Sequence, residues 1–200
     1  GPNVYTYTYT VNAAGGGNTD GTATITLSTP SVPATPTFVI DTTTPTVPAA
    51  ITPPTYTNTT TVTNVTYTNS VDANLSTHNV RACTSNDCVT GCVGQMTDAA
   101  SPVDVAGLSN GTAYFICVQG VDTAGNISAY VPSATTVTVD TTPPTVASGV
   151  SVPAYTTSTS GDVSFTGGTD TNITTSNVRM CTSNDCTTGC VGATTGNSPT

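Results

Sequence analysis

The sequence contains no lysine, no glutamate and no tryptophan, and its only strongly cationic side chains are Arg81 and Arg179. Charged residues make up 6% of the chain, against roughly 25% in an ordinary soluble domain. Nucleic acids and anionic membrane surfaces are bound by clustered cations, which two distant arginines and a net charge of −9 do not provide. No apolar run approaches the roughly 20 residues that span a bilayer, so we expect no membrane insertion of this segment.

The residues that most enzymes use for catalysis are also scarce. Without lysine or glutamate, Schiff-base chemistry, phosphate clamps and most carboxylate pairs are unavailable. His78 is the only histidine, and the pattern around it predicts a solvated loop residue without a nucleophile beside it. We therefore expect that the protein is not an enzyme.

Threonine, by contrast, fills about a quarter of the positions. Its β-branched side chain suits a pleated strand and fits a helix poorly, so the composition predicts an all-β fold. A disordered stalk is the rival interpretation, but the regular alternation of Val, Ile, Tyr and Phe argues against it. Seven cysteines in so short a chain indicate an oxidising compartment, and thus an extracellular or cell-surface location.

A long segment of the sequence occurs twice. Asn79–Gly94 recurs with two substitutions as Asn177–Gly192, 98 residues further along. Asp41–Thr46 recurs as Asp140–Thr145, at an offset of 99 residues. Both markers predict a repeat of the size of an immunoglobulin-like sandwich.

The repeat suggests three divisions of the chain. Residues 1–40 are expected to hold the C-terminal hairpin of a preceding β-sandwich, with strands at Val4–Val11 and Thr22–Leu27. Residues 41–139 would form one complete domain, and residues 140–200 the N-terminal half of a third. We interpret the two half domains as an excerpt from a longer array.

Within 41–139, the alternation of apolar residues predicts individual strands. One strand is expected at Thr61–Tyr67, and a turn at Asp122–Asn126. The residues expected to face the core are Val80, Ala82, Tyr114, Ile116, Val118, Val137 and Val139.

Gly107–Ser128 resembles the late strands of bacterial fibronectin type III-like domains, in which a leucine six residues before a tyrosine marks a tyrosine corner, here Leu108 and Tyr114. Asp140–Thr145 resembles the joints between such domains in large bacterial surface proteins. The chain departs from this family because it lacks a core tryptophan and carries a foreign cysteine-bearing insert. Other bacterial immunoglobulin-like repeats remain an alternative, particularly for 1–40.

The resemblance also implies a disulfide pattern. The strands that contain Cys83 and Cys117 are neighbours in the resembled sandwich, which favours a Cys83–Cys117 bond. Cys88 would then pair with Cys92 across a bend at Gly91, although four cysteines allow three pairings. Cys186 and Cys190 repeat the short pair, and the partner of Cys181 is expected near position 215. Zinc is a weaker alternative, because the spacing lacks a C-x2-C knuckle.

Aspartates suggest a possible cofactor. In the resembled topology Asp41, Asp72 and Asp122 gather at one pole, where three carboxylates and backbone carbonyls would bind calcium. Asp140 and Asp170 repeat the first two positions. The alternative is that these aspartates serve only as turn residues and surface charge.

The sequence thus predicts a structural or adhesive segment of an extracellular surface protein or fibre. Its expected partners are neighbouring repeats, another cell surface or a polysaccharide, contacted through loops or through exposed tyrosines such as Tyr56, Tyr67, Tyr130 and Tyr155. One alternative is a carbohydrate- or surface-binding accessory module of a secreted enzyme, although aromatics make up only 6%. Another alternative is a filament completed by strand exchange between chains. Thr8 argues against it, because Thr8 occupies the position at which the exchanged strand would need a cysteine to pair with Cys181.

Overall fold

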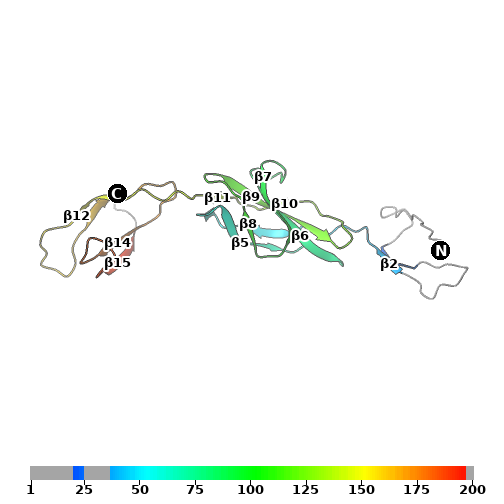
Figure 1. Ribbon diagram of the computed structural model, residues 1–200, viewed down its shortest axis with the longest axis horizontal. Coiled ribbons are helices and arrows are strands. Elements are labelled where there is room, and N and C mark those ends of the chain that lie inside the picture. Colours follow the sequence, from blue (N-terminus) through cyan, green and yellow to red (C-terminus); the bar gives the residue numbers. More distant parts are fainter. Residues whose placement is uncertain (1–19, 25–36, 197–200) are drawn as a thin grey trace, which may run out of the picture. The chain divides into compact units, whose positions relative to one another are not determined.

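The computed structural model describes residues 20–24 and 37–196, and this part of the chain is built from fifteen strands without a helix (Figure 1). The all-β prediction is therefore confirmed. The chain divides into two compact units, residues 1–141 and 142–200, which we call unit 1 and unit 2. The predicted boundary at 139/140 lies two residues from this division. None of the described segments is a helix that could cross a membrane.

Two sheets of unit 1 enclose one common core. The smaller sheet has the order β3 (Ala49–Thr52), β5 (Thr61–Thr68) and β8 (Val103–Ala106). The larger sheet has the order β4 (Tyr56–Thr57), β11 (Val137–Val139), β9 (Ala113–Asp122), β6 (Leu75–Cys83) and β7 (Cys92–Ala99), and β10 (Val131–Pro132) also pairs with β9. Neighbouring strands are antiparallel, except that β4 runs parallel to β11.

The core lies between these sheets, as in a β-sandwich. The smaller sheet contributes Val62, Val65, Val103 and Val105, and the larger sheet contributes Val80, Ala82, Tyr114, Ile116, Val118, Val137 and Val139. The seven core residues predicted from the sequence are all buried. Since burying a valine side chain stabilises a fold by roughly 1.5–3 kcal/mol, this cluster is the main source of the stability of unit 1.

A two-stranded sheet precedes the sandwich. It pairs β1 (Gly21–Thr24) with β2 (Thr37–Ile40) in antiparallel register. The strand at 37–40 was not predicted. The predicted strand at Val4–Val11 lies outside the described residues, as do residues 25–27 of the strand expected at Thr22–Leu27.

Unit 2 contains two hairpins. One pairs β12 (Ser148–Ser151) with β13 (Ser164–Thr166), and the other pairs β14 (Ser176–Met180) with β15 (Val191–Gly196). The Thr145 amide donates a 3.0 Å hydrogen bond to the Thr169 carbonyl, as the Thr46 amide does at 3.1 Å to Val71 in unit 1.

The tyrosine corner is present in unit 1. Leu108 and Tyr114 are both buried, and the Tyr114 hydroxyl accepts a 3.3 Å hydrogen bond from the Ser109 amide. The connection at the C-terminal end of β9 is also the predicted turn, closed by a hydrogen bond from the Asp122 amide to the Asn126 carbonyl at 3.1 Å. The resemblance therefore identified the first feature, and the local turn signal identified the second.

His78 was wrongly predicted to be a solvated loop residue. It lies within β6 with 3% of its surface exposed, and its Nε2 atom accepts a 3.1 Å hydrogen bond from the Ser70 amide. Tyr67, expected to be exposed, is also buried; its ring meets the imidazole edge-on at 5.0 Å, and its hydroxyl donates to the Ala99 carbonyl. The surrounding sequence is polar, so only the strand pairing reveals this burial.

We expect unit 1 to lose stability as the pH falls below about 6.5. Burial lowers the pKa of His78 below its ordinary value of 6.5. Below that value the unfolded chain takes up a proton that the folded chain does not, so acidification favours unfolding until the folded-state pKa is passed. The measurement is the urea midpoint at several pH values. His78→Gln should remove the slope in this range, because aspartates ordinarily titrate near 3.9; an equal slope in both proteins would contradict the assignment.

Candidate functional site

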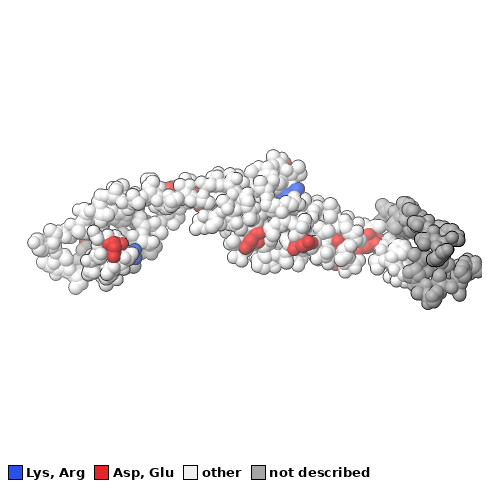
Figure 2. Space-filling model, in the orientation of Figure 1, with Lys and Arg blue, Asp and Glu red and all other residues white. Residues whose placement is uncertain are grey.

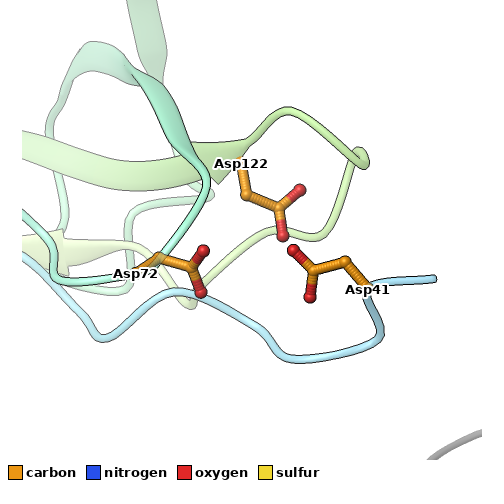
Figure 3. Close-up of side chains that lie close together, drawn as sticks. All are labelled: Asp41, Asp72 and Asp122. Carbon is orange, nitrogen blue, oxygen red and sulfur yellow. The ribbon is translucent and has the colours of Figure 1, made fainter. Parts of the chain in front are cut away.

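Three aspartates of unit 1 meet where the chain enters the sandwich. Asp41 follows β2 directly, Asp72 lies in the connection between β5 and β6, and Asp122 is the last residue of β9. Figure 3 shows the three carboxylates pointing toward one another, and one oxygen from each lies within 4.8 Å of the other two. We call Asp41, Asp72 and Asp122 the acidic cluster.

Local turns hold two of these carboxylates in place. Asp122 is buried, and its Oδ1 and Oδ2 atoms accept 2.8 Å hydrogen bonds from the amide and the side-chain Nδ2 of Asn126. Asp72 accepts a 2.8 Å hydrogen bond from the Asn74 amide. These contacts are those expected of aspartates that serve as turn residues.

Two asparagines connect the turns to the entering chain. Asn74 Nδ2 donates to Asp41 Oδ2 at 2.8 Å, and Asn126 Nδ2 donates to the Asp41 backbone carbonyl at 3.0 Å. Sequence reasoning named the aspartates but missed these asparagines. The signal that could have found Asn74 is the spacing Asp-x-Asn at Asp72, which recurs at Asp170.

A fourth acidic residue, Asp20, lies beside this entry. Its carboxylate accepts hydrogen bonds from the Thr42 amide at 2.9 Å, from the Thr42 hydroxyl at 2.8 Å and from the Thr43 hydroxyl. The hydrogen bond from Thr43, followed by those from Thr42, lowers the pKa of Asp20. Asp20 therefore ties the β1–β2 hairpin to the residues that follow Asp41.

The acidic cluster has no neutralising cation in the described part of unit 1. Arg81, the only arginine of this unit, donates to the Cys88 carbonyl and lies 3.8 Å from the centre of the Tyr130 ring. In Figure 2 the acidic side chains are set in a surface that is otherwise almost uncharged. Three like charges so close together repel one another, and a bound cation would remove that repulsion.

The oxygen positions suit a calcium ion in size. Calcium binds six to eight oxygens at about 2.3–2.6 Å, so two ligands of one ion are at most about 5 Å apart. Rotation of the Asn74 and Asn126 amides by 180° would add two oxygens to the three carboxylates, at the cost of the hydrogen bonds that their Nδ2 atoms donate to Asp41 and Asp122. Of the remaining predicted pair, Asp140 belongs to unit 1 and Asp170 to unit 2.

The four cysteines of unit 1 form two disulfides, but not the predicted ones. Cys83 bonds Cys92 and Cys88 bonds Cys117. The predicted Cys83–Cys117 and Cys88–Cys92 bonds are therefore wrong.

Strand register explains the correction. Cys83 lies directly opposite Cys92 on β7, with 4.0 Å between their Cα atoms. On β9 its opposite residue is Phe115, because Cys117 lies opposite Arg81. All four thiols are consumed in these bonds, so unit 1 offers no thiolate for zinc.

The loop between β6 and β7 covers the outer face of the larger sheet. Cys83, Cys88 and Cys117 are buried together, with Cys92 and Tyr130 packed against them. The turn is fixed by Asp87, which accepts hydrogen bonds from the amides of Val89 and Thr90 and from the Thr90 hydroxyl at 2.6–2.9 Å. These bonds, above all the one from the Thr90 hydroxyl, lower the pKa of Asp87 to about 2.

The same loop recurs in unit 2. Cys181 bonds Cys190, which corrects the predicted Cys186–Cys190 bond and the predicted partner of Cys181 near position 215. Asp185 repeats the contacts of Asp87, with hydrogen bonds of 2.7–2.8 Å from Thr187 and Thr188. Cys186, the counterpart of Cys88, is exposed and forms no disulfide.

Comparison with protein-family models and with curated protein sequences finds no match for this chain.

Peptide mapping should find Cys83–Cys92 and Cys88–Cys117. Cleavage after arginine and before aspartate separates the cysteines into the fragments 82–86 (Cys83), 87–97 (Cys88 and Cys92) and 104–121 (Cys117). The observed pairing joins all three fragments into one species. Fragmentation of 87–97 between its two cysteines should then assign each partner by mass spectrometry. Recovery of 87–97 as a separate, internally bonded peptide would contradict the structure.

Proposed function

We propose that this chain is a structural and adhesive segment of an extracellular surface protein or fibre, built from fibronectin type III-like sandwiches and without catalytic activity. The observation that carries the proposal is the duplicated disulfide hairpin: Cys83–Cys92 and Cys181–Cys190 close the same loop in both units. Disulfides persist in oxidising compartments, which supports a location outside the cell. The tyrosine corner of Tyr114 supports the family assignment.

The disulfides suit a load-bearing role. Cys88–Cys117 joins the β6–β7 loop to β9 across a separation of 29 residues. When the ends of the chain are pulled apart, the residues between these cysteines are held back from extension by a covalent bond. The proposed partners are neighbouring repeats and a second cell surface or polysaccharide.

We also propose that a calcium ion bound by the acidic cluster stiffens the segment through which the chain enters the sandwich. Asp41 belongs to the entering chain, whereas Asp72 and Asp122 belong to the sandwich. An ion shared by all three would fix the entering chain to the sandwich, and the uncompensated charge of the cluster favours such binding.

Calcium should raise the melting temperature of the chain by several degrees. Extracellular calcium modules bind with a Kd of about 10⁻⁴–10⁻³ M, and ligand at 100 times its Kd stabilises by about 2.7 kcal/mol. We therefore expect a shift at about 10 mM Ca²⁺ that EGTA reverses. Asp122→Asn should abolish it.

Asp98→Asn is the matched control for the calcium experiment. It removes the same charge from an exposed position whose φ of 59° an asparagine adopts readily. This variant should keep the full calcium shift. No shift in the unmodified chain, or an equal loss in both variants, would remove the calcium proposal.

In force spectroscopy, unit 1 should release less chain when oxidised than when reduced. A difference of roughly 100 Å is expected, because an extended residue spans roughly 3.5 Å and the Cys88–Cys117 bond holds 29 residues. The variant with Cys88→Ala and Cys117→Ala should show a difference of only roughly 30 Å, because its remaining Cys83–Cys92 bond holds 9 residues.

Location is tested separately, with antibodies raised against the chain. Intact cells of the source organism should be labelled, and external protease should remove the label. Labelling only after permeabilisation would overturn the extracellular assignment.

In the force-spectroscopy experiment, equal extension of the oxidised and the reduced protein would overturn the load-bearing role.

A further inference from the structure

A pocket of about 350 Å³ lies beside His78 in unit 1 and shares no residue with the acidic cluster. Its wall is formed by the start of β6, by the end of β7 and by Asn69, which directly follows β5. Ligand pockets have volumes of about 300–1,000 Å³, so this pocket is large enough for a small molecule.

An irregularity in β7 brings a carboxylate to this pocket. The register between β6 and β7 shifts between His78 and Val80, where β7 holds one residue more than β6. Such a β-bulge redirects a side chain from the regular alternation of the strand. Asp98 lies in this bulge with a φ of 59°, and it forms part of the pocket wall.

The Asp98 carboxylate has no partner within the described residues. The other aspartates of unit 1 all have partners, with hydrogen bonds to Asp20, Asp41, Asp72, Asp87, Asp104 and Asp122 and a further interaction at Asp140. The side chains of Asn69, Ser76 and Thr77, which line the same pocket, also form no hydrogen bond in the described part of the chain. These polar groups are therefore available to a ligand.

His78 adds a hydrogen-bond donor from within the sandwich. The residue is 3% exposed, and its Nε2 atom accepts the hydrogen bond from the Ser70 amide, so Nδ1 carries the proton of the neutral ring. Among the described residues Nδ1 has no hydrogen-bond partner, and it is not sealed inside the core. Because His78 lines the pocket, an acceptor bound there can receive this proton in a hydrogen bond.

The pocket thus offers both kinds of hydrogen-bonding group. His78 Nδ1 and Asn69 Nδ2 can donate, whereas the Asp98 carboxylate accepts. A cation would leave the donors unpaired, and an anion would be repelled by Asp98. Sugar hydroxyls both donate and accept, and the C–H groups of a sugar ring can pack against Leu75 and Ala100 of the same wall.

We propose that this pocket binds a neutral saccharide, with Asp98 accepting hydrogen bonds from sugar hydroxyls and with Asn69 and His78 Nδ1 donating to them. The net charge of −9 disfavours an acidic polysaccharide, which supports a neutral ligand. The inference rests on the adhesive function proposed above, for which it names a site and a ligand class.

The test is an NMR titration of the isotope-labelled full chain at neutral pH with EGTA present. The probes are four neutral disaccharides, namely maltose, cellobiose, lactose and chitobiose. We expect at least one of them to shift the amide resonances of Ser76, Thr77 and Asp98 along one saturation curve, with a Kd on the order of 1 mM. The Nδ1–H resonance of His78 should follow the same curve.

Two variants remove polar groups of the pocket. Asp98→Gly should raise the Kd roughly tenfold, because it removes a charged hydrogen-bond acceptor, and glycine adopts the positive φ of this position. Asn69→Ala should raise the Kd roughly threefold through the loss of a neutral hydrogen bond. Asn86→Ala is the matched control, because Asn86 is exposed and lies outside the pocket, and it should leave the Kd unchanged.

The absence of a saturable shift with all four disaccharides would overturn the proposal, as would an unchanged Kd in the Asp98→Gly chain. Tighter binding of ethylammonium than of every disaccharide at the same residues would also overturn it, because the site would then be cationic in preference. Cell labelling and force spectroscopy do not involve this pocket. Failure of saccharide binding therefore leaves the proposed function to those experiments, and their failure leaves saccharide binding in place.

Discussion

The antiparallel pairing of β6 with β9 is the interaction on which the rest of unit 1 depends. The ladder runs from Leu75 opposite Asp122 to Cys83 opposite Phe115. Because side chains alternate between the faces of a sheet, one register sends Val80 and Ile116 into the core and the cysteines to the outer face. A slip of one residue would exchange the two faces, so the core and the disulfides require the same register.

The two ends of this ladder carry different chemistry. One end holds Cys83, which lies opposite Phe115, and Cys117 lies two positions further along β9. At this end disulfide bonds join the β6–β7 loop to the sheet. The other end holds Asp122, where the entering chain brings Asp41 and the connection to β6 brings Asp72. The sandwich thus fixes one end by sulfur bonds, whereas the other end concentrates negative charge that a cation would neutralise.

Comparison of unit 2 with unit 1 distinguishes the contacts within the hairpin from the burial of its apolar side chains. Its β14–β15 hairpin keeps the turn of Asp185 and the Cys181–Cys190 bond in the absence of a β9 equivalent among the described residues. The contacts that hold this hairpin join residues of short sequence separation. Burial does not follow from it, since Met180 stays exposed where Ala82 is enclosed.

The sequence by itself determined the strand chemistry: threonine content predicts the β fold, alternation places Ile116 and Val118 inside, and recurrence predicts the second hairpin. The gathering of Asp41, Asp72 and Asp122 also followed, once the resemblance supplied a topology. Only the tertiary structure decided the disulfide partners and the burial of His78. The reason is that local alternation gives the face of a residue but not its opposite neighbour, which depends on register between strands far apart in the chain.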